Sequence, residues 1–198
     1  PTEAPTQQAQ TTQAAPTEQP TPEPDPVQQL LEEMTLEQKV GQLFLVRPDS
    51  LDLSQTQDQI NDAKADGVTE LTDAMRQTLA EYPVGGVVIF GKNLESPQQI
   101  TQFLDDLQQA SDTPLFTAID EEGGLVARLA NNAAFDLPQY ESAAAVGTSG
   151  NPEDARAMGR TIGGYLKEYG FNLDFAPVAD VNTNPDNPVI GTRAFSSE

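Results

Sequence analysis

Short apolar runs alternate with amphipathic helical patterns along most of this chain, and this alternation most limits the folds that it can adopt. Four runs have the length and composition of strands: residues 40–46, 85–90, 115–119 and 171–180. Apolar residues at helical spacing precede or separate these runs, in residues 27–34, 71–79, 100–107 and 155–169. Strands and helices in this order are typical of a parallel sheet with helical crossovers.

Capping residues predict where several of the helices begin and end. Thr35 and Gln38 form a capping-box pattern, which predicts a second short helix directly before the first strand. Ser96 and Asn151 each stand before a proline, as expected for the N-caps of two longer helices. Gly170 is well placed to end the second of these helices.

The number of strands decides between two α/β architectures. A TIM (β/α)8 barrel has eight strands and typically about 250 residues, whereas this chain has four predicted strands within residues 27–198. We therefore expect an α/β fold, a TIM barrel truncated to roughly its first half. An open doubly wound domain is the alternative, since it could be complete at this length. The first strand leads into Arg47 and Pro48 rather than into a glycine-rich phosphate loop, which favours the barrel.

Residues 1–26 differ in composition from the rest of the chain. They are mostly Pro, Thr and Gln and contain no aromatic residue, which predicts a disordered, solvated linker. Residues 27–198 then form the incomplete barrel domain. Because the chain begins at Pro1 and carries such a tract, we expect an exported bacterial protein, extracellular or at the cell surface, anchored to the membrane through a processed N-terminus.

Composition excludes several classes of function. The net charge of −21 would repel nucleic acids and anionic lipid surfaces, so we expect no nucleic-acid partner. The chain has no cysteine and no histidine, which rules out disulfides, thiol catalysis, Ser-His-Asp triads and His-ligated metals from within it. We expect no cofactor and no metal site.

Charged side chains recur where the predicted strands end, which in parallel α/β folds is where ligands bind. Six of them follow strand ends or lie in the loops beyond: Lys92, Asp120, Glu122, Arg128, Asp180 and Arg193. Carboxylates and arginines at a barrel mouth suit a polar neutral ligand such as a sugar.

The carboxylates of this group allow more than one role. Asp120 and Asp180 could be the acid and nucleophile of a glycosidase, or carboxylates could hold a divalent metal. Asp180 could equally cap a turn. We expect Asp174, within the fourth predicted strand, to make a hydrogen bond inside the barrel, because an unpaired charge there would be costly.

Three segments resemble the N-terminal domain of glycoside hydrolase family 3, and in particular its bacterial β-N-acetylglucosaminidase (β-hexosaminidase) branch. The first, residues 34–43, looks like the opening helix and strand of the family. The second is the Asp-Glu-Glu-Gly-Gly segment at 120–124 together with Arg128. The third comprises residues 175–182 and the Asn-Pro-Val-Ile-Gly-Thr-Arg-Ala-Phe segment at 187–195.

The resemblance implies a retaining glycosidase that hydrolyses terminal non-reducing N-acetylglucosamine residues of β-linked oligosaccharides or peptidoglycan fragments. Asp120 would hold sugar hydroxyls, and Arg128 and Arg193 would add hydrogen bonds to the substrate. The catalytic histidine and aspartate of the family would lie beyond Glu198. Asp120 therefore becomes a binding residue rather than half of a catalytic pair with Asp180.

The same resemblance leaves two alternatives open: a catalytically silent, surface-tethered sugar-binding module, or a β-glucosidase of the same family. We expect the full-length protein to be a monomer. The chain alone should be inactive, and it should be unstable or aggregation-prone because a half barrel leaves strand edges unpaired.

Overall fold

The computed structural model describes residues 25–198, so nearly all of the predicted linker at residues 1–26 lies outside the described residues. The chain divides after Met34 into two units. The described part of the first unit is helix α1 (Pro26–Glu33), whose N-cap Asp25 accepts a hydrogen bond from the Val27 amide. The apolar side chains of α1 are largely exposed.

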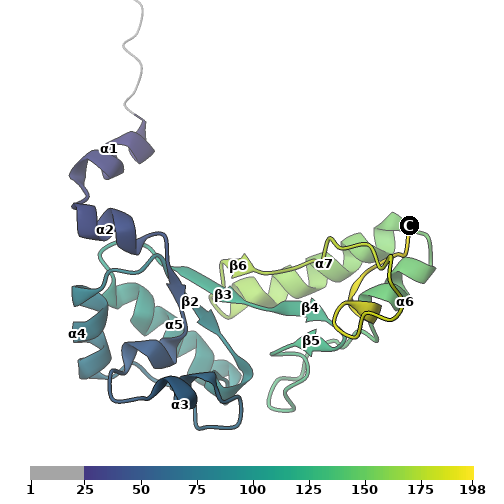
Figure 1. Ribbon diagram of the computed structural model, residues 1–198, viewed down its shortest axis with the longest axis horizontal. Helices are drawn as coiled ribbons and strands as arrows, with labels where there is room; N and C mark the ends of the chain where they lie inside the picture. Colours follow the sequence, from purple (N-terminus) through teal and green to yellow (C-terminus); the bar gives the residue numbers. More distant parts are fainter. Residues whose placement is uncertain (1–24) are drawn as a thin grey trace, which may run out of the picture. The chain divides into compact units, whose positions relative to one another are not determined.

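The second unit, residues 35–198, is built on a four-stranded parallel sheet (Figure 1). Its strands are β1 (Leu45–Val46), β2 (Gly86–Ile89), β3 (Phe116–Ile119) and β6 (Leu173–Asp174), which lie side by side in that order. Each of these four strands pairs with the next of the four in chain order, as in a barrel, whereas the order of a doubly wound sheet reverses. The prediction of four parallel strands in barrel order is confirmed.

Helices and short 3-10 helices precede, connect and follow the strands of the second unit. In chain order they are α2 (Leu36–Gly41), η1 (Pro48–Leu51), α3 (Gln57–Asn61), α4 (Asp73–Glu81), η2 (Gly91–Asn93), α5 (Pro97–Ala110), α6 (Ala143–Thr148), α7 (Pro152–Glu168) and η3 (Gly191–Arg193). The Thr35–Gln38 capping box forms in full, and Ser96 and Asn151 cap α5 and α7 as predicted. Gly170 adopts the positive φ of 95° that a residue ending α7 requires.

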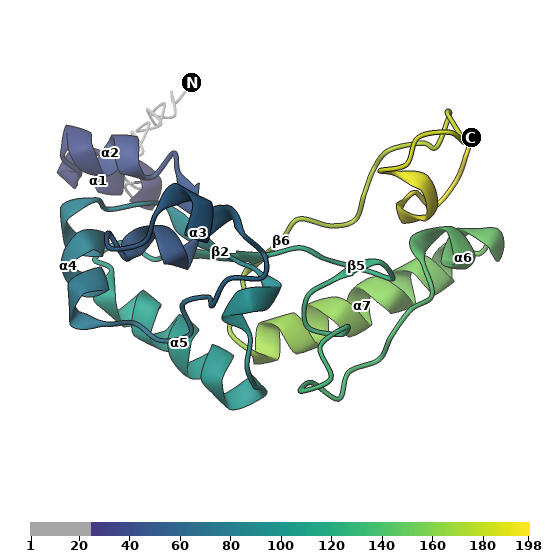
Figure 2. The ribbon, with the colours of Figure 1, turned by 60° about the horizontal axis from the view of Figure 1, so that its bottom comes forward.

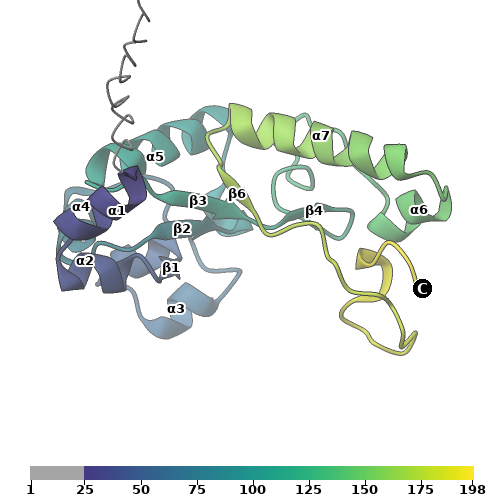
Figure 3. The ribbon, with the colours of Figure 1, turned by 90° about the horizontal axis from the view of Figure 1, so that it is seen from above.

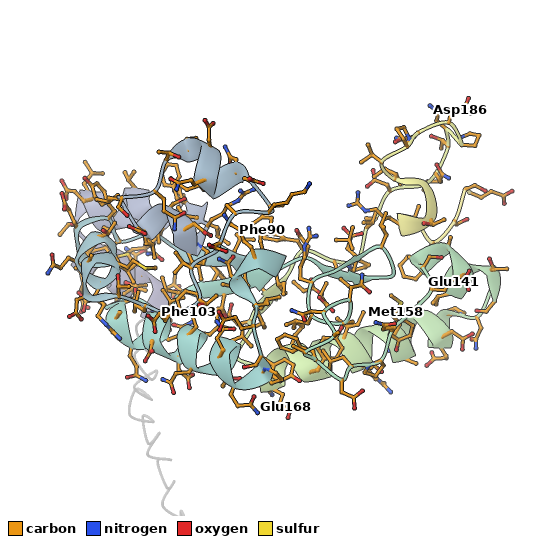
Figure 4. All side chains as sticks on the ribbon, turned by 90° about the horizontal axis from the view of Figure 1, so that it is seen from below. Phe90, Phe103, Glu141, Met158, Glu168 and Asp186 are labelled. Atoms are coloured by element: carbon orange, nitrogen blue, oxygen red, sulfur yellow. The ribbon has the colours of Figure 1, made fainter. Side chains whose placement is uncertain are left out.

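The two long helices cover one face of the sheet. Helices α5 and α7 lie along the same side of the strands in Figures 2 and 3. The apolar residues of α5 that were predicted to share a face (Ile100, Phe103, Leu104 and Leu107) are all buried, and so are Met158, Ile162 and Leu166 of α7. Phe103 and Met158, labelled in Figure 4, belong to one continuous core with Val87, Ile89 and Ile119 of the sheet.

The first and last predicted strands are much shorter than expected. The prediction of a buried strand over 40–46 is wrong, because α2 continues to Gly41 and the Gly41 carbonyl then accepts hydrogen bonds from the Phe44 and Gly85 amides. Only Leu45 and Val46 remain to pair with β2. The strand predicted at 171–180 pairs only at 173–174, because its partner β3 ends at Ile119.

A short antiparallel hairpin follows β3 where a loop was expected. It consists of β4 (Glu121–Gly123) and β5 (Val126–Ala127) (Figure 1). Gly123 and Gly124 make the turn with φ of 84° and 68°, a region that favours glycine.

A buried ion pair joins residues 47–61 to the end of β2. Lys92 Nζ lies 3.1 Å from Asp49 Oδ1, and the two side chains are 5% and 0% exposed. Lys92 also donates to the carbonyls of Gln59 and Ile60. Asp49 accepts two further hydrogen bonds, from the Val68 amide and the Asn93 side chain.

We predict that Lys92→Met lowers the free energy of unfolding by about 3–5 kcal/mol, because it leaves the Asp49 carboxylate buried without its cation. Urea unfolding followed by circular dichroism measures the change. The matched control is Arg156→Met, since the Arg156–Glu153 pair is largely exposed and should be worth at most about 1 kcal/mol. Equal losses in the two variants would contradict the prediction.

The open edge of the sheet at β1 carries exposed apolar side chains. Leu43 is 79% exposed and Phe44 is 55% exposed. Beside them is a cavity of about 580 Å³ lined by Leu36, Val40, Phe44, Val46, Tyr82 and Pro83, among others.

From this surface we predict concentration-dependent association of the chain, measurable by sedimentation velocity, because exposed edges and apolar patches favour contact between molecules. Replacing Leu43 and Phe44 together by serine should reduce the association. Leu53→Ser serves as the control, since Leu53 is 70% exposed but lies in the segment after η1. A wild-type chain that stays monomeric at every concentration would show the prediction to be wrong.

Candidate functional site

Three consecutive carboxylates follow the end of β3. Successive side chains of an extended segment point to opposite sides, so Asp120 and Glu122 share one side and Glu121 takes the other. The structure agrees, because Asp120 and Glu122 each face an arginine whereas the Glu121 side chain is wholly buried. The alternation thus turns Asp120 and Glu122 toward the arginines and Glu121 into the core, although the Glu122 side chain is itself only 7% exposed.

Asp120 and Glu122 each form an ion pair. Arg128 Nη2 donates to Asp120 Oδ2 at 3.0 Å, and the two side chains are about one third exposed. Arg193 grips Glu122 through two hydrogen bonds, from Nε at 2.8 Å and from Nη2 at 2.7 Å. The hydrogen bond to Glu122 raises the pKa of Arg193. Of the predicted site residues, Asp120 and Arg128 are in direct contact, and Arg193 contacts the residue two positions after Asp120.

An aromatic ring at the end of β2 lies against two arginines. The Arg47 guanidinium carbon is 4.3 Å from the centroid of the Phe90 ring, and that of Arg128 is 5.8 Å from it. Both distances fall within the range of cation–π attraction. Phe90, labelled in Figure 4, therefore helps to place Arg128. Neither Phe90 nor Arg47 was predicted at the site, although Phe90 ends the second predicted strand.

Glu121 is the third residue that sequence reasoning did not place. Its carboxylate accepts hydrogen bonds from the Leu129 and Ala130 amides, each at 2.9 Å, and from the Tyr165 hydroxyl at 2.8 Å. The weak signal in the sequence was the strand alternation itself, because it turns the middle carboxylate of the three inward.

Asp174 ends β6 and lies beside these carboxylates. Its Oδ1 accepts a hydrogen bond from the Glu121 amide at 2.9 Å, so the interior hydrogen bond expected for Asp174 is confirmed. Burial raises the pKa of Asp174 to about 6, and the nearby charges of Glu121, Asp120 and Glu122 act in the same direction against the hydrogen bond that lowers it.

Two other charged residues of the predicted mouth are placed differently from what was expected. Asp180 is exposed and lies six residues beyond the end of β6 at Asp174, so it does not directly follow a strand end as expected. Its charge is nevertheless close enough to Arg193 to help raise the pKa of that side chain, after the larger effect of Glu122. Lys92 does follow β2, but its ammonium group is buried against Asp49. The direct contacts at the mouth are therefore the two carboxylate–arginine pairs and the Phe90 ring beside Arg128.

The second unit, residues 35–198, matches one family model from its first residue to its last. The glycosyl hydrolase family 3 N terminal domain matches residues 35–198. The chain belongs to this family. Its parallel four-stranded sheet is accordingly part of the (β/α)8 barrel domain of glycoside hydrolase family 3.

Relatives of this family 3 domain include named hydrolases. The chain is 37% identical over 134 residues to beta-hexosaminidase A of Pseudoalteromonas piscicida, which covers 65% of this chain and 22% of that protein. It is 33% identical over 134 residues to the beta-hexosaminidase of Thiobacillus denitrificans, covering 66% of this chain and 36% of that protein.

Solved structures show the same fold. A family 3 β-N-acetylglucosaminidase from Paenibacillus sp. is 34% identical with a TM-score of 0.67, over 82% of this chain and 27% of that one. NagZ from Neisseria gonorrhoeae, solved with N-trifluoroacetyl-D-glucosamine, is 25% identical with a TM-score of 0.58, over 66% of this chain and 39% of that one. This family 3 chain spans between about a fifth and two fifths of the length of these relatives.

A cavity adjoins the site in the family 3 domain, whereas metal-binding clusters and membrane-spanning helices are absent from the described residues. A cavity of about 430 Å³ is lined by Glu121, Glu122, Asp174 and the face of α7 around Met158 and Ile162, among others. Within residues 25–198, no group of three or more His, Cys, Asp and Glu side chains is arranged to hold a metal ion. In the same residues, no helix has the length and apolar composition needed to span a membrane.

The raised pKa of Asp174 predicts a pH-dependent stability of the family 3 domain. A carboxyl whose pKa is higher in the folded than in the unfolded state contributes most stability below its unfolded value, and this contribution is lost as the pH rises through the folded value. For Asp174 the window runs from about 4 to about 6. We predict that Asp174→Asn removes this loss, because the asparagine oxygen can still accept from the Glu121 amide.

Thermal unfolding of wild type and Asp174→Asn at pH 4 and pH 7 checks this. The variant should gain stability relative to wild type at the higher pH. The exposed Asp180→Asn provides the control and should follow wild type at both values. A constant difference between Asp174→Asn and wild type across the window would be inconsistent with a raised pKa.

Proposed function

We propose that this chain is part of a retaining β-N-acetylglucosaminidase that removes terminal non-reducing N-acetylglucosamine from β-linked oligosaccharides or peptidoglycan fragments. Family membership and the names of the relatives support the proposal. The Paenibacillus structure is a β-N-acetylglucosaminidase, and the NagZ structure contains a glucosamine derivative. We further propose that the protein is exported and anchored at the cell surface, as the composition of residues 1–26 suggests.

Within this chain, Asp120, Arg128 and Arg193 are proposed to bind the sugar. The observation that carries this assignment is the pairing of Asp120 with Arg128 and of Glu122 with Arg193 beyond the end of β3. Each pair presents carboxylate acceptors beside guanidinium donors, and a sugar hydroxyl can both donate and accept. Because each arginine is already held, a sugar would meet groups whose direction is largely fixed, which lowers the entropy cost of binding.

The same contacts argue against a catalytic role for these carboxylates. A retaining glycosidase needs one carboxylate free to attack the sugar and a second group to act as acid and base. Asp120 and Glu122 are engaged by arginines, and Glu121 is wholly buried beneath three donors. We therefore propose that the chain binds sugar without cleaving it and that cleavage requires residues of a longer protein.

We predict that the chain binds N-acetylglucosamine and that Arg128→Ala weakens the binding by about tenfold or more, as expected for loss of a hydrogen bond to a charged group. Arg193→Ala should act in the same direction. Titration followed by NMR chemical-shift changes measures the affinity. Arg156→Ala, on the exposed face of α7, is the matched control and should leave the affinity unchanged. The site assignment would be refuted by equal affinities of Arg128→Ala and wild type.

Two comparisons separate the remaining possibilities. Tighter binding of N-acetylglucosamine than of glucose favours the β-N-acetylglucosaminidase over a β-glucosidase. The chain itself should release no 4-nitrophenol from 4-nitrophenyl N-acetyl-β-D-glucosaminide, whereas a full-length protein that contains it should. Binding without release by the full-length protein would instead indicate a sugar-binding module.

A further inference from the structure

The Glu121 carboxylate is buried without a cation among residues 25–198. Three neutral donors compensate its charge: two backbone amides and the Tyr165 hydroxyl. Burying a carboxylate costs several kcal/mol even after relaxation, and an apolar side chain of similar volume usually fills such a space at lower cost. The acid at this position therefore contributes something other than core packing, namely the direction of the groups that it binds.

The two amides that Glu121 binds follow Arg128 directly. Glu121 Oε2 accepts from Leu129 and Oε1 accepts from Ala130. On the other side of Arg128, Ala127 pairs with Glu121 across the hairpin. The backbone of Arg128 is therefore fixed on both sides by the same residue.

The hairpin ladder alone is too small to fix that backbone. It joins three residues of β4 to two residues of β5, and its register shifts between Glu121 and Gly123. Isolated two-stranded hairpins are at best marginally stable in water. The carboxylate adds two charge-assisted hydrogen bonds to this short ladder, and such bonds are roughly twice as strong as neutral ones.

The side chain of Arg128 depends on its backbone for direction. Among residues 25–198, its guanidinium makes one hydrogen bond to a side chain, from Nη2 to Asp120, and its Nε is buried with no hydrogen-bond partner. The Phe90 ring, 5.8 Å from the guanidinium carbon, adds a contact that has little direction of its own. A guanidinium held at one nitrogen can rotate when its Cα moves. A shift of residues 128–130 would thus turn the Arg128 guanidinium away from the Asp120 carboxylate.

Glu121 is itself anchored from two other elements. Tyr165 reaches it from α7, and its own amide is held by Asp174 at the end of β6. Burial and the charge of Glu121 raise the pKa of Tyr165, so that the hydroxyl stays protonated and remains a donor. Hydrogen bonds therefore join Glu121 to α7 and β6 on one side and to the Leu129 and Ala130 amides, directly after Arg128, on the other.

We propose that Glu121 is a positioning residue for sugar binding, which fixes the Arg128 guanidinium beside Asp120 without touching the sugar. The inference rests on the proposed role of Arg128 in binding the sugar. Two experiments separate the positioning from that role, one without the sugar and one with it.

The first experiment follows the side-chain Nε–H signals of the arginines by ¹⁵N NMR in the sugar-free chain. Glu121→Gln has a single acceptor oxygen and cannot satisfy both amides and the hydroxyl as before. We expect it to shift or broaden the Arg128 signal and to leave the Arg193 signal in place. The matched control, Glu122→Gln, should do the reverse, because Arg193 Nε donates to Glu122.

Tyr165→Phe is the milder variant in case Glu121→Gln folds poorly. It removes one of the three donors and keeps the carboxylate, so it should displace the Arg128 signal in the same direction by a smaller amount. An Arg128 signal that is unchanged in Tyr165→Phe, and in Glu121→Gln if that variant folds, would overturn the positioning role.

The second experiment is a double-mutant cycle on the affinity for N-acetylglucosamine. Glu121→Gln should weaken binding about three- to tenfold in the wild-type background and not at all in the Arg128→Ala background, because the two residues act through one guanidinium. Equal losses in both backgrounds would overturn the proposal. If Arg128→Ala itself leaves the affinity unchanged, the sugar-binding role fails, while the sugar-free signals still decide whether Glu121 positions Arg128.

Discussion

The structure of the site depends on one constraint: three consecutive carboxylates follow β3 at the edge of the core, and each must find donors. The alternation of an extended chain sends Asp120 and Glu122 to the mouth and Glu121 to the interior. The mouth carboxylates pair with arginines, and the interior one binds amides and a tyrosine hydroxyl. An unsatisfied carboxylate at the buried positions of Glu121 and Glu122 would cost several kcal/mol, so the surrounding segments must supply the donors.

The segments that supply those donors come from distant parts of the chain. Tyr165 of α7 is 44 residues from Glu121, and Arg193 is 71 residues from Glu122. The hairpin β4–β5, helix α7, strand β6 and the Arg193 turn thus converge on one stretch of three residues. The proposed sugar site and part of the core share these contacts, so the buried Glu121 is linked to the side chains that are proposed to bind the sugar.

Local patterns predicted the scaffold well, because helix caps and apolar spacing act over a few residues. The Ser96 and Asn151 caps located α5 and α7, and the apolar runs located β2 and β3 almost to the residue. The features that differ from the prediction, at residues 40–46 and at Lys92, depend on contacts between segments that are distant in the sequence. Residues 40–46 are apolar apart from Gln42, yet most become helix and turn because the Gly41 carbonyl accepts hydrogen bonds from the Phe44 and Gly85 amides. Lys92, expected at the mouth, is drawn to a buried aspartate 43 positions earlier, Asp49.

A crystal structure of the chain with N-acetylglucosamine tests most directly whether Asp120, Arg128 and Arg193 bind the terminal sugar, as we propose. We expect sugar hydroxyls within about 2.7–3.2 Å of the Asp120 carboxylate and of the Arg128 and Arg193 guanidinium groups. Sugar bound only in another place, such as the cavity of about 580 Å³ beside β1, with both ion pairs untouched, would contradict this proposal.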